Sequence, residues 1–156
     1  MVHQLLESRG ETVSSAESLT GGRLATVRTE VPGSSSTFKG GVVTYATELK
    51  VTILGVAQEV VDRHGVVSAA CAEAMAEGVR SLTGATYGVS TTGVAGPAEQ
   101  EGKPPGTVFV GLAGPAGVRS VALELEGQRS EITRQAVDAA LAVFADALRE
   151  EETALG

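Results

Sequence analysis

The sequence is poor in cysteine and in aromatic residues. Cys71 is its only cysteine, so the chain can form neither an intrachain disulfide nor a cysteine-rich zinc site. It has no tryptophan, three phenylalanines and two tyrosines, so alanine, valine and leucine must fill most of the interior. Because 42% of the residues are hydrophobic, a chain of 156 residues can form a core without disulfide or metal support.

Long hydrophobic runs and an excess of positive charge are also missing. No stretch of about 18 apolar residues occurs, so we expect no membrane span. The start, MVHQLLESRG, lacks the apolar segment of a signal peptide, which favours a soluble, cytoplasmic protein. The formal net charge of −7 argues against general nucleic-acid binding, which needs clustered Lys and Arg. A local pocket for one small phosphate remains compatible with this charge.

Helical and strand patterns alternate along the chain without a repeat or a linker, which predicts one domain over residues 1–156. The clearest helix covers residues 69–82, with Ser68 as its N-cap and apolar residues at i, i+3, i+4, i+7 spacing. Further helices are expected over 2–9, 20–31, 47–53, 57–64 and 130–148, and strands over 12–15, 41–46 and 86–93. The turn-like AGPAG at 113–117 joins strands 107–112 and 118–125 into a hairpin. This order predicts an α/β sandwich with a mixed sheet.

The first candidate for chemistry is the segment SSAESLTGGRLAT (14–26), a predicted junction from strand to helix. It carries Ser18, Thr20, Gly21 and Gly22, where the start of a helix presents unpaired backbone N–H groups. A serine at such a position can attack a carbonyl carbon while the N–H groups hold the oxyanion. Ser18 or Thr20 can also be a plain helix cap, and the local sequence alone favours that interpretation.

The second candidate is the pair Tyr45 and Lys50 in VVTYATELK, where Tyr45 is expected to end a buried strand. Amide hydrolysis by serine needs a base, and we expect both histidines, His3 and His64, at the solvated surface. A partly buried lysine can replace histidine, because desolvation lowers its pKa and leaves a neutral amine. The spacing alone also allows Lys50 to be an exposed helix residue.

Further candidate ligand-binding residues are small or basic residues in loops and at a helix start. They are Thr92, Gly93 and Gly96 in the loop 90–108, Gly33, Ser34 and Ser35 in the turn 33–36, and Arg129 and Arg134. The loop 90–108 follows a strand, where open α/β sheets usually bind ligands, although a surface Ω-loop is an equally good interpretation. The turn and the arginines are candidate hydrogen-bond donors to a phosphate, although simple capping or a solvated face is the simpler interpretation.

Taken together, these segments resemble the CinA C-terminal family, whose enzymatic members are nicotinamide-nucleotide amidohydrolases of the PncC type. The matching runs are AESLTGG (16–22), VPGSSSTFKGGVVTYATELK (31–50), LGV (54–56), HGVVS (64–68), STTGVAGP (90–97) and KPPGTV (103–108). They occur in family order over nearly the whole chain, so the joint match is specific although each run alone is weak.

The resemblance implies a serine nucleophile acting with a lysine and a tyrosine, which fall on Ser18, Lys50 and Tyr45. The implied reaction converts nicotinamide mononucleotide and water to nicotinic acid mononucleotide and ammonia, with no metal and no organic cofactor. The family fold is similar to a three-layer α/β/α sandwich around a mixed, mostly parallel five-stranded sheet. The family also implies a homodimer, which the alanine-rich helix 69–82 supports because small apolar residues occupy more than one of its faces.

Three departures from the family pattern bear on the site but leave the implied catalytic side chains in place. Gln128 stands where an aspartate is common, residues 98–101 replace a glycine-rich continuation, and Thr47 replaces an asparagine. One alternative is a non-catalytic nucleotide-binding module with a role in competence or the DNA-damage response. A related amidase that acts on another small carboxamide is a further alternative.

Overall fold

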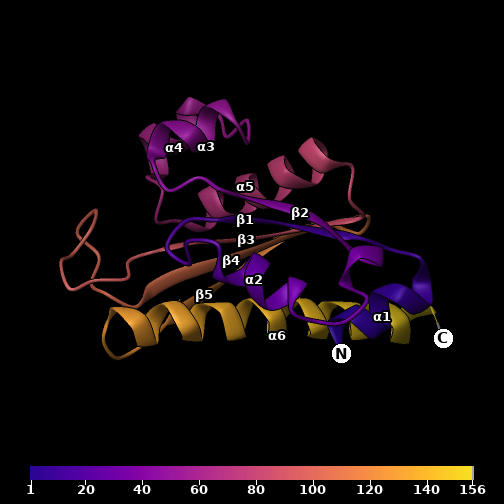
Figure 1. The fold of residues 1–156 in the computed structure, drawn as a ribbon. Helices are drawn as coiled ribbons and strands as arrows, with labels where there is room; N and C mark the ends of the chain where they lie inside the picture. The colour runs from indigo at the N-terminus through magenta and orange to yellow at the C-terminus, as the bar shows by residue number, and fades with distance from the viewer. Residues whose placement is uncertain (156) are drawn as a thin grey trace.

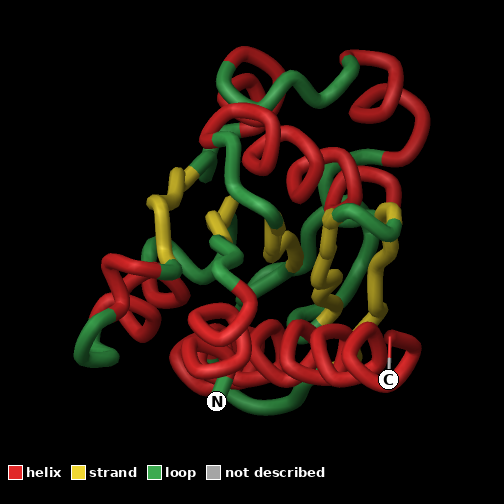
Figure 2. Tube along the Cα trace, turned by 90° about the vertical axis from the view of Figure 1, so that its right-hand side faces the viewer, coloured by secondary structure: helices red, strands yellow, loops and turns green. Residues whose placement is uncertain are grey.

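Five strands form one mixed sheet between two layers of helices (Figures 1 and 2). The computed structural model describes residues 1–155, so Gly156 of the expected domain lies outside the described residues. The strands are β1 (Val13–Glu17), β2 (Phe38–Val43), β3 (Tyr87–Gly93), β4 (Thr107–Gly114) and β5 (Gly117–Glu124). Their order is β2-β1-β3-β4-β5, in which β1 pairs in parallel with β2 and β3 while β4 runs antiparallel to both neighbours. The expected sandwich with a mixed five-stranded sheet and a late hairpin is confirmed.

The helices divide between the two faces of the sheet (Figure 1). One layer contains α1 (Val2–Arg9), α2 (Arg23–Thr29) and α6 (Arg129–Leu155), and the other contains α3 (Thr47–Thr52), α4 (Gln58–His64) and α5 (Ala69–Thr83). A short 3₁₀ turn, η1 (Ser34–Ser36), precedes β2. None of the helices in residues 1–155 combines the length and the apolar character that crossing a bilayer requires.

Helix α5 forms where its sequence predicts a helix. The Ser68 hydroxyl accepts a hydrogen bond from the Cys71 N–H, which caps the N-terminus, and Gly84 ends the helix in the left-handed conformation. The apolar face buries Met75 and Val79 against the sheet, whereas Leu82 is exposed. The structure describes one chain, so the homodimer that the alanine-rich helix suggested stays a prediction.

Helices α1 and α6 form the opposite core, and this packing corrects the expectation for one histidine. The Tyr87 and Phe144 rings meet edge to face with their centroids 5.2 Å apart, and Leu6 packs into the same cluster. Because α1 is held there, His3 is 8% exposed, and its Nδ1 lies 2.8 Å from Thr37 Oγ1. The prediction of a solvated His3 was wrong, whereas His64 is exposed as expected.

Candidate active site

The carboxyl ends of the parallel strands β1, β2 and β3 meet at one edge of the sheet. Ser18 directly follows β1, and its backbone N–H donates to Thr91 O of β3 at 3.0 Å. Thr44 directly follows β2, and its N–H donates to Glu17 O at 2.9 Å. These backbone bonds fix the Ser18 side chain at the edge where open α/β sheets usually bind ligands.

Lys50 extends from α3 into this edge and contacts Ser18. Its Nζ atom donates to Ser18 Oγ at 3.0 Å, to Thr44 O at 2.6 Å and to Tyr45 O at 3.4 Å. Lys50 is 1% exposed, and no carboxylate in residues 1–155 forms an ion pair with it. The alternative that Lys50 is an exposed helix residue was therefore wrong.

Burial sets the electrostatics of the two groups beside Ser18. Desolvation lowers the pKa of the Lys50 amine. The Cys71 thiol, when it is ionised, and the carboxylates of Glu101 and Glu48 oppose this shift without cancelling it. Burial also raises the pKa of the Cys71 thiol to about 11, so this thiol is protonated at neutral pH. Burial thus shifts the amine next to the serine hydroxyl toward its neutral form.

A buried carboxylate that the sequence did not single out holds the turn after Ser18. Glu17 is 1% exposed, and its Oε1 accepts from Thr20 Oγ1 at 2.6 Å and from Leu24 N at 2.8 Å. Its Oε2 accepts from Ala25 N at 3.1 Å. Glu17 at the end of β1 therefore accepts from N–H groups in the first turn of α2, which is favourable because an anion here also meets the helix dipole.

The turn 18–22 leaves backbone donors free next to the serine. Helix α2 begins at Arg23 rather than at Thr20, because Gly21 and Gly22 adopt the left-handed φ values of 58° and 102°. The Gly21 N–H donates to Ser18 O at 3.1 Å. Within residues 1–155, the N–H groups of Leu19, Thr20 and Gly22 donate to no protein acceptor. Leu19 and Thr20 line cavities beside the serine, so their N–H groups are the candidate donors to a ligand, whereas Gly22 lines neither cavity.

Ser18 and Lys50 line a cavity of about 420 Å³ that gathers half of the predicted site residues. The predicted residues around it are Ser18, Tyr45, Lys50, Thr92, Gly93, Gly96 and Arg129. Residues 98–100 line the same cavity, so the altered loop does face the site. The Thr92 hydroxyl donates to Val66 O at 2.7 Å, which ties the end of β3 to the segment before α5.

Several predicted residues lie elsewhere. Gly33, Ser34 and Ser35 precede β2, at the amino end of the parallel strands, so the structure does not bring this turn to the cavity. Arg134 is exposed on α6 and lines neither this cavity nor the one beside it. Thr20 and Gly21 line the neighbouring cavity, and Gly22 is the N-cap of α2.

Tyr45 differs most from its expected setting. Strand β2 ends at Val43, and Tyr45 is 61% exposed rather than the end of a buried strand. Its hydroxyl accepts from Arg129 Nη2 at 2.8 Å, whereas its backbone carbonyl faces Lys50. The expectation of a buried Tyr45 was wrong, and the structure does not bring the phenol to the amine of Lys50.

Comparison with known proteins gives one family. The model of the CinA C-terminal domain matches residues 1–148. The chain belongs to the CinA C-terminal domain family. A CinA-like protein from Frankia casuarinae is 53% identical over 137 residues, which cover 88% of this chain and 32% of the relative. One from Synechocystis is 49% identical over 130 residues, or 83% of this chain and 31% of the relative. The chain thus spans about a third of the length of these curated relatives.

Solved structures of the same superfamily share the fold. A CinA superfamily protein from Klebsiella pneumoniae superposes with a TM-score of 0.93 at 32% identity, covering 96% of this chain and 94% of the other. The competence/damage inducible protein CihA from Agrobacterium tumefaciens gives a TM-score of 0.87 at 34% identity, covering 95% of each chain. The three-layer arrangement expected from the family resemblance is therefore confirmed.

Two of the departures from the CinA pattern lie where the chain makes defined contacts. The Gln128 backbone N–H donates to Glu131 Oε1 at 2.9 Å, which is half of a capping box at the start of α6, and this bond does not involve the glutamine side chain. Glu101 accepts from Val66 N and Val67 N, each at 2.9 Å, and so fastens the 93–106 loop to the segment before α5. Neither departure removes a side chain from the Ser18 cavity.

Proposed function

We propose that this chain hydrolyses the carboxamide of nicotinamide mononucleotide, with Ser18 as nucleophile and Lys50 as base. The observation that carries the proposal is the 3.0 Å contact between Lys50 Nζ and Ser18 Oγ in a buried setting without a carboxylate partner. The substrate comes from the family resemblance. The proposal includes a cytoplasmic location, because the substrate is a metabolite of the cell interior, and a homodimer.

The contacts of Lys50 give a neutral amine a defined orientation. A neutral amine has two N–H donors and one lone pair, and the carbonyls of Thr44 and Tyr45 accept both donors. The lone pair is then left for the Ser18 hydroxyl, so that in this neutral state the 3.0 Å hydrogen bond reverses and Ser18 Oγ donates to Lys50 Nζ. A lysine oriented in this way can do the work that a histidine does in other serine hydrolases.

The reaction proceeds in two displacements through an ester of Ser18. Ser18 Oγ attacks the carboxamide carbon while its proton passes to Lys50, and the free N–H groups of the turn 18–22 stabilise the oxyanion. Lys50 returns the proton to the leaving nitrogen, so ammonia departs and an acyl ester remains on Ser18. Water attacks the ester with Lys50 again as base, which releases the carboxylic acid and restores the serine.

Ammonia release tests this function directly. Purified protein is incubated with nicotinamide mononucleotide, free nicotinamide and several unrelated small carboxamides, and ammonia is measured for each. We expect the mononucleotide to be the preferred substrate, and preference for another carboxamide would replace it with a related amidase activity. If no compound released ammonia, the result would favour a non-catalytic nucleotide-binding module. This is the second candidate, because similar proteins are named for competence and damage induction.

A further inference from the structure

A second cavity of about 990 Å³ adjoins the one that contains Ser18. The two share the walls formed by Leu19, Tyr45, Ala95, Pro97 and Arg129. Polar side chains from the first turns of α2 and α6 and from the segments just before them complete the second cavity, namely Thr20, Arg23, Gln128, Ser130 and Thr133. Tyr45 and Arg129, which are joined by a hydrogen bond, line both cavities, so a molecule that occupies both would lie against this pair.

Two guanidinium groups in the second cavity carry positive charge that no carboxylate neutralises. Arg23 Nη1 donates to Thr133 Oγ1, and Arg129 donates to Gly96 O and to the Tyr45 hydroxyl, all of them neutral acceptors. No carboxylate in residues 1–155 forms an ion pair with either arginine.

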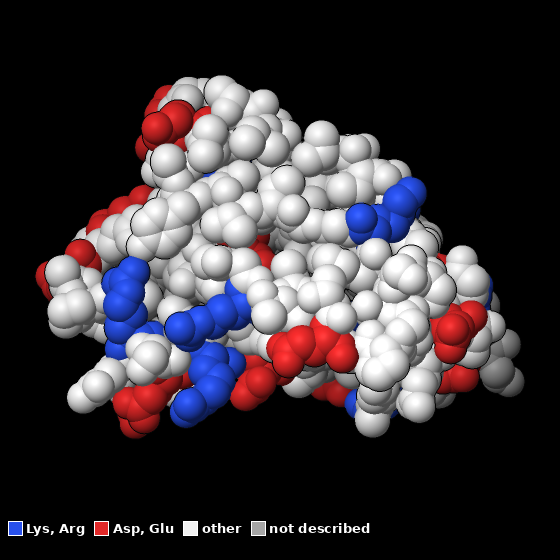
Figure 3. Space-filling view, in the orientation of Figure 1, with Lys and Arg blue, Asp and Glu red and all other residues white. Residues whose placement is uncertain are grey.

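Although the chain has 19 acidic and 12 basic residues, five arginines form no ion pair within residues 1–155, namely Arg23, Arg28, Arg80, Arg129 and Arg134. Of these five, Arg23 and Arg129 line the second cavity. Arg9, Arg63, Arg119 and Arg149 each pair with a Glu or an Asp. Glu131, in the first turn of α6, directs its carboxylate to the Gln128 N–H instead of to Arg129. Figure 3 shows Lys and Arg side chains gathered at the end of the molecule where α6 begins.

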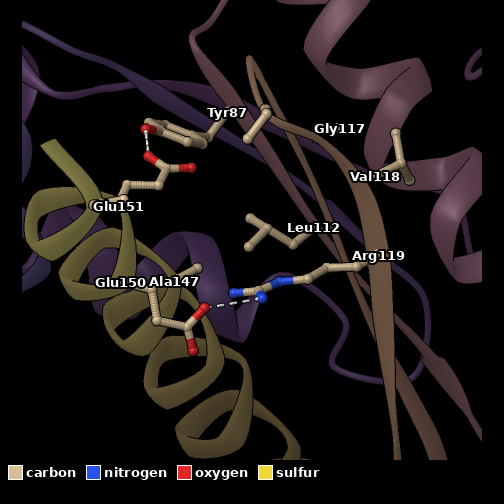
Figure 4. Close-up of a pocket in the computed structure, with 11 residues that line it drawn as sticks. Tyr87, Leu112, Gly117, Val118, Arg119, Ala147, Glu150 and Glu151 are labelled. Carbon is tan, nitrogen blue, oxygen red and sulfur yellow. Dashed lines mark hydrogen bonds and ion pairs between the residues drawn. The ribbon is translucent and has the colours of Figure 1, made fainter.

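The cavity at the opposite edge of the sheet gives the contrast (Figure 4). This cavity of about 280 Å³ also contains an arginine, but Arg119 pairs with Glu150 at 3.1 Å. The Tyr87 hydroxyl there donates to Glu151 at 2.5 Å. Arg119 in that cavity has a carboxylate partner within the chain, whereas Arg23 and Arg129 have only neutral acceptors.

We propose that Arg23 and Arg129 form an anion subsite that binds the phosphate of the nucleotide whose carboxamide reacts at Ser18. The identity of the ligand rests on the proposed function. A phosphate monoester suits the subsite because it accepts several charge-assisted hydrogen bonds from guanidinium groups, and the Ser130 hydroxyl in the same cavity adds a donor. The site therefore selects 5′-mononucleotides over nucleosides and free amides of the same base.

Binding measurements in a Ser18→Ala background test the subsite without turnover. Nicotinamide mononucleotide and nicotinamide riboside, which lacks the phosphate, are titrated calorimetrically into the parent, Arg23→Gln and Arg134→Gln. Arg134→Gln makes the same change of charge at an exposed position outside both cavities. We expect Arg23→Gln to weaken mononucleotide binding about tenfold or more and to leave riboside binding unchanged. Arg134→Gln should bind both ligands as the parent does.

The subsite would be overturned if Arg23→Gln bound the mononucleotide with the affinity of the parent. It would also be overturned if Arg23→Gln lost the same affinity for the riboside as for the mononucleotide, or if Arg134→Gln lost as much mononucleotide affinity as Arg23→Gln. Arg23→Lys, which keeps the charge but loses the planar fork, should be intermediate, and thermal unfolding checks that each variant is folded. Ammonia release by the wild type separates this proposal from the proposed function. Arg23-dependent binding without ammonia would retain the subsite and reject the amidase, and ammonia release without Arg23 dependence would do the reverse.

Discussion

The Nζ atom of Lys50 lies 3.0 Å from the Oγ atom of Ser18, although 32 positions separate the two residues in the sequence. Parallel pairing of β1 with β2 ends both strands at the same edge, and α3 then folds back so that Lys50 reaches the serine. Helix α3 has only six residues, so its position depends on the contacts that Lys50 makes as well as on its own helical bonds.

Ser18→Ala should abolish ammonia release and leave nucleotide binding nearly intact, because it removes the nucleophile and little volume. A loss of about a hundredfold or more in kcat is expected for a nucleophile. Steady-state ammonia release and calorimetric binding measure the two effects. Ser35→Ala, in the exposed turn at the other edge of the sheet, is the matched control and should behave as wild type. Near-normal turnover by Ser18→Ala would remove Ser18 from the mechanism.

Lys50→Arg should be inactive although it preserves the positive charge, because a guanidinium does not act as a base at neutral pH. In the wild type, protonation of Lys50 removes the base, so kcat/KM should fall on the acid side of the pH profile. Burial lowers the pKa of Lys50, so this fall begins below the range of an exposed lysine. An active Lys50→Arg variant would mean that the lysine contributes charge and not proton transfer.

Tyr45→Phe should raise KM for the mononucleotide more than it lowers kcat, because the phenol contacts Arg129 rather than Lys50. Arg129→Met removes the other partner of the same hydrogen bond, so the effects of the two substitutions on kcat/KM should be non-additive. Steady-state kinetics of both single variants and the double variant measures this coupling. A loss in kcat as large as that of Ser18→Ala would instead give Tyr45 a direct part in proton transfer.

Glu17→Gln should lower the free energy of unfolding by about 2–3 kcal/mol, since it replaces a buried anion that accepts three hydrogen bonds at the start of α2. Urea unfolding measures the loss. Glu30→Gln removes a charge from an exposed residue at the other end of α2 and serves as the control, with an expected change within about 0.5 kcal/mol. Equal stability of the two variants would show that the Glu17 carboxylate does not hold the turn.

The parts of the fold that depend on local sequence were predictable. Ser68 and Gly84 delimit α5, and AGPAG gives the β4–β5 hairpin, because caps and turns involve residues close in the chain. The Ser18–Lys50 pair was reached through the family resemblance, since it depends on the pairing of two strands. Glu17 was missed because its role depends on a turn that two glycines with positive φ create. Arg23 was missed because its neutral partner, Thr133, lies on α6, far along the chain.

The buried amine of Lys50 should also make stability depend on pH. Below its native pKa, Lys50 binds a proton in both the folded and the unfolded state, so it adds no pH dependence. Between that pKa and the usual lysine value of about 10.4, the unfolded state binds more protons than the native state. The free energy of unfolding of the wild type should therefore rise with pH in this window relative to that of Lys50→Met, by at most about 1.4 kcal/mol per pH unit. Urea unfolding of both proteins from pH 7 to pH 10 measures the difference, and parallel profiles would show that Lys50 keeps its proton in the native state throughout, which is incompatible with a neutral base beside Ser18.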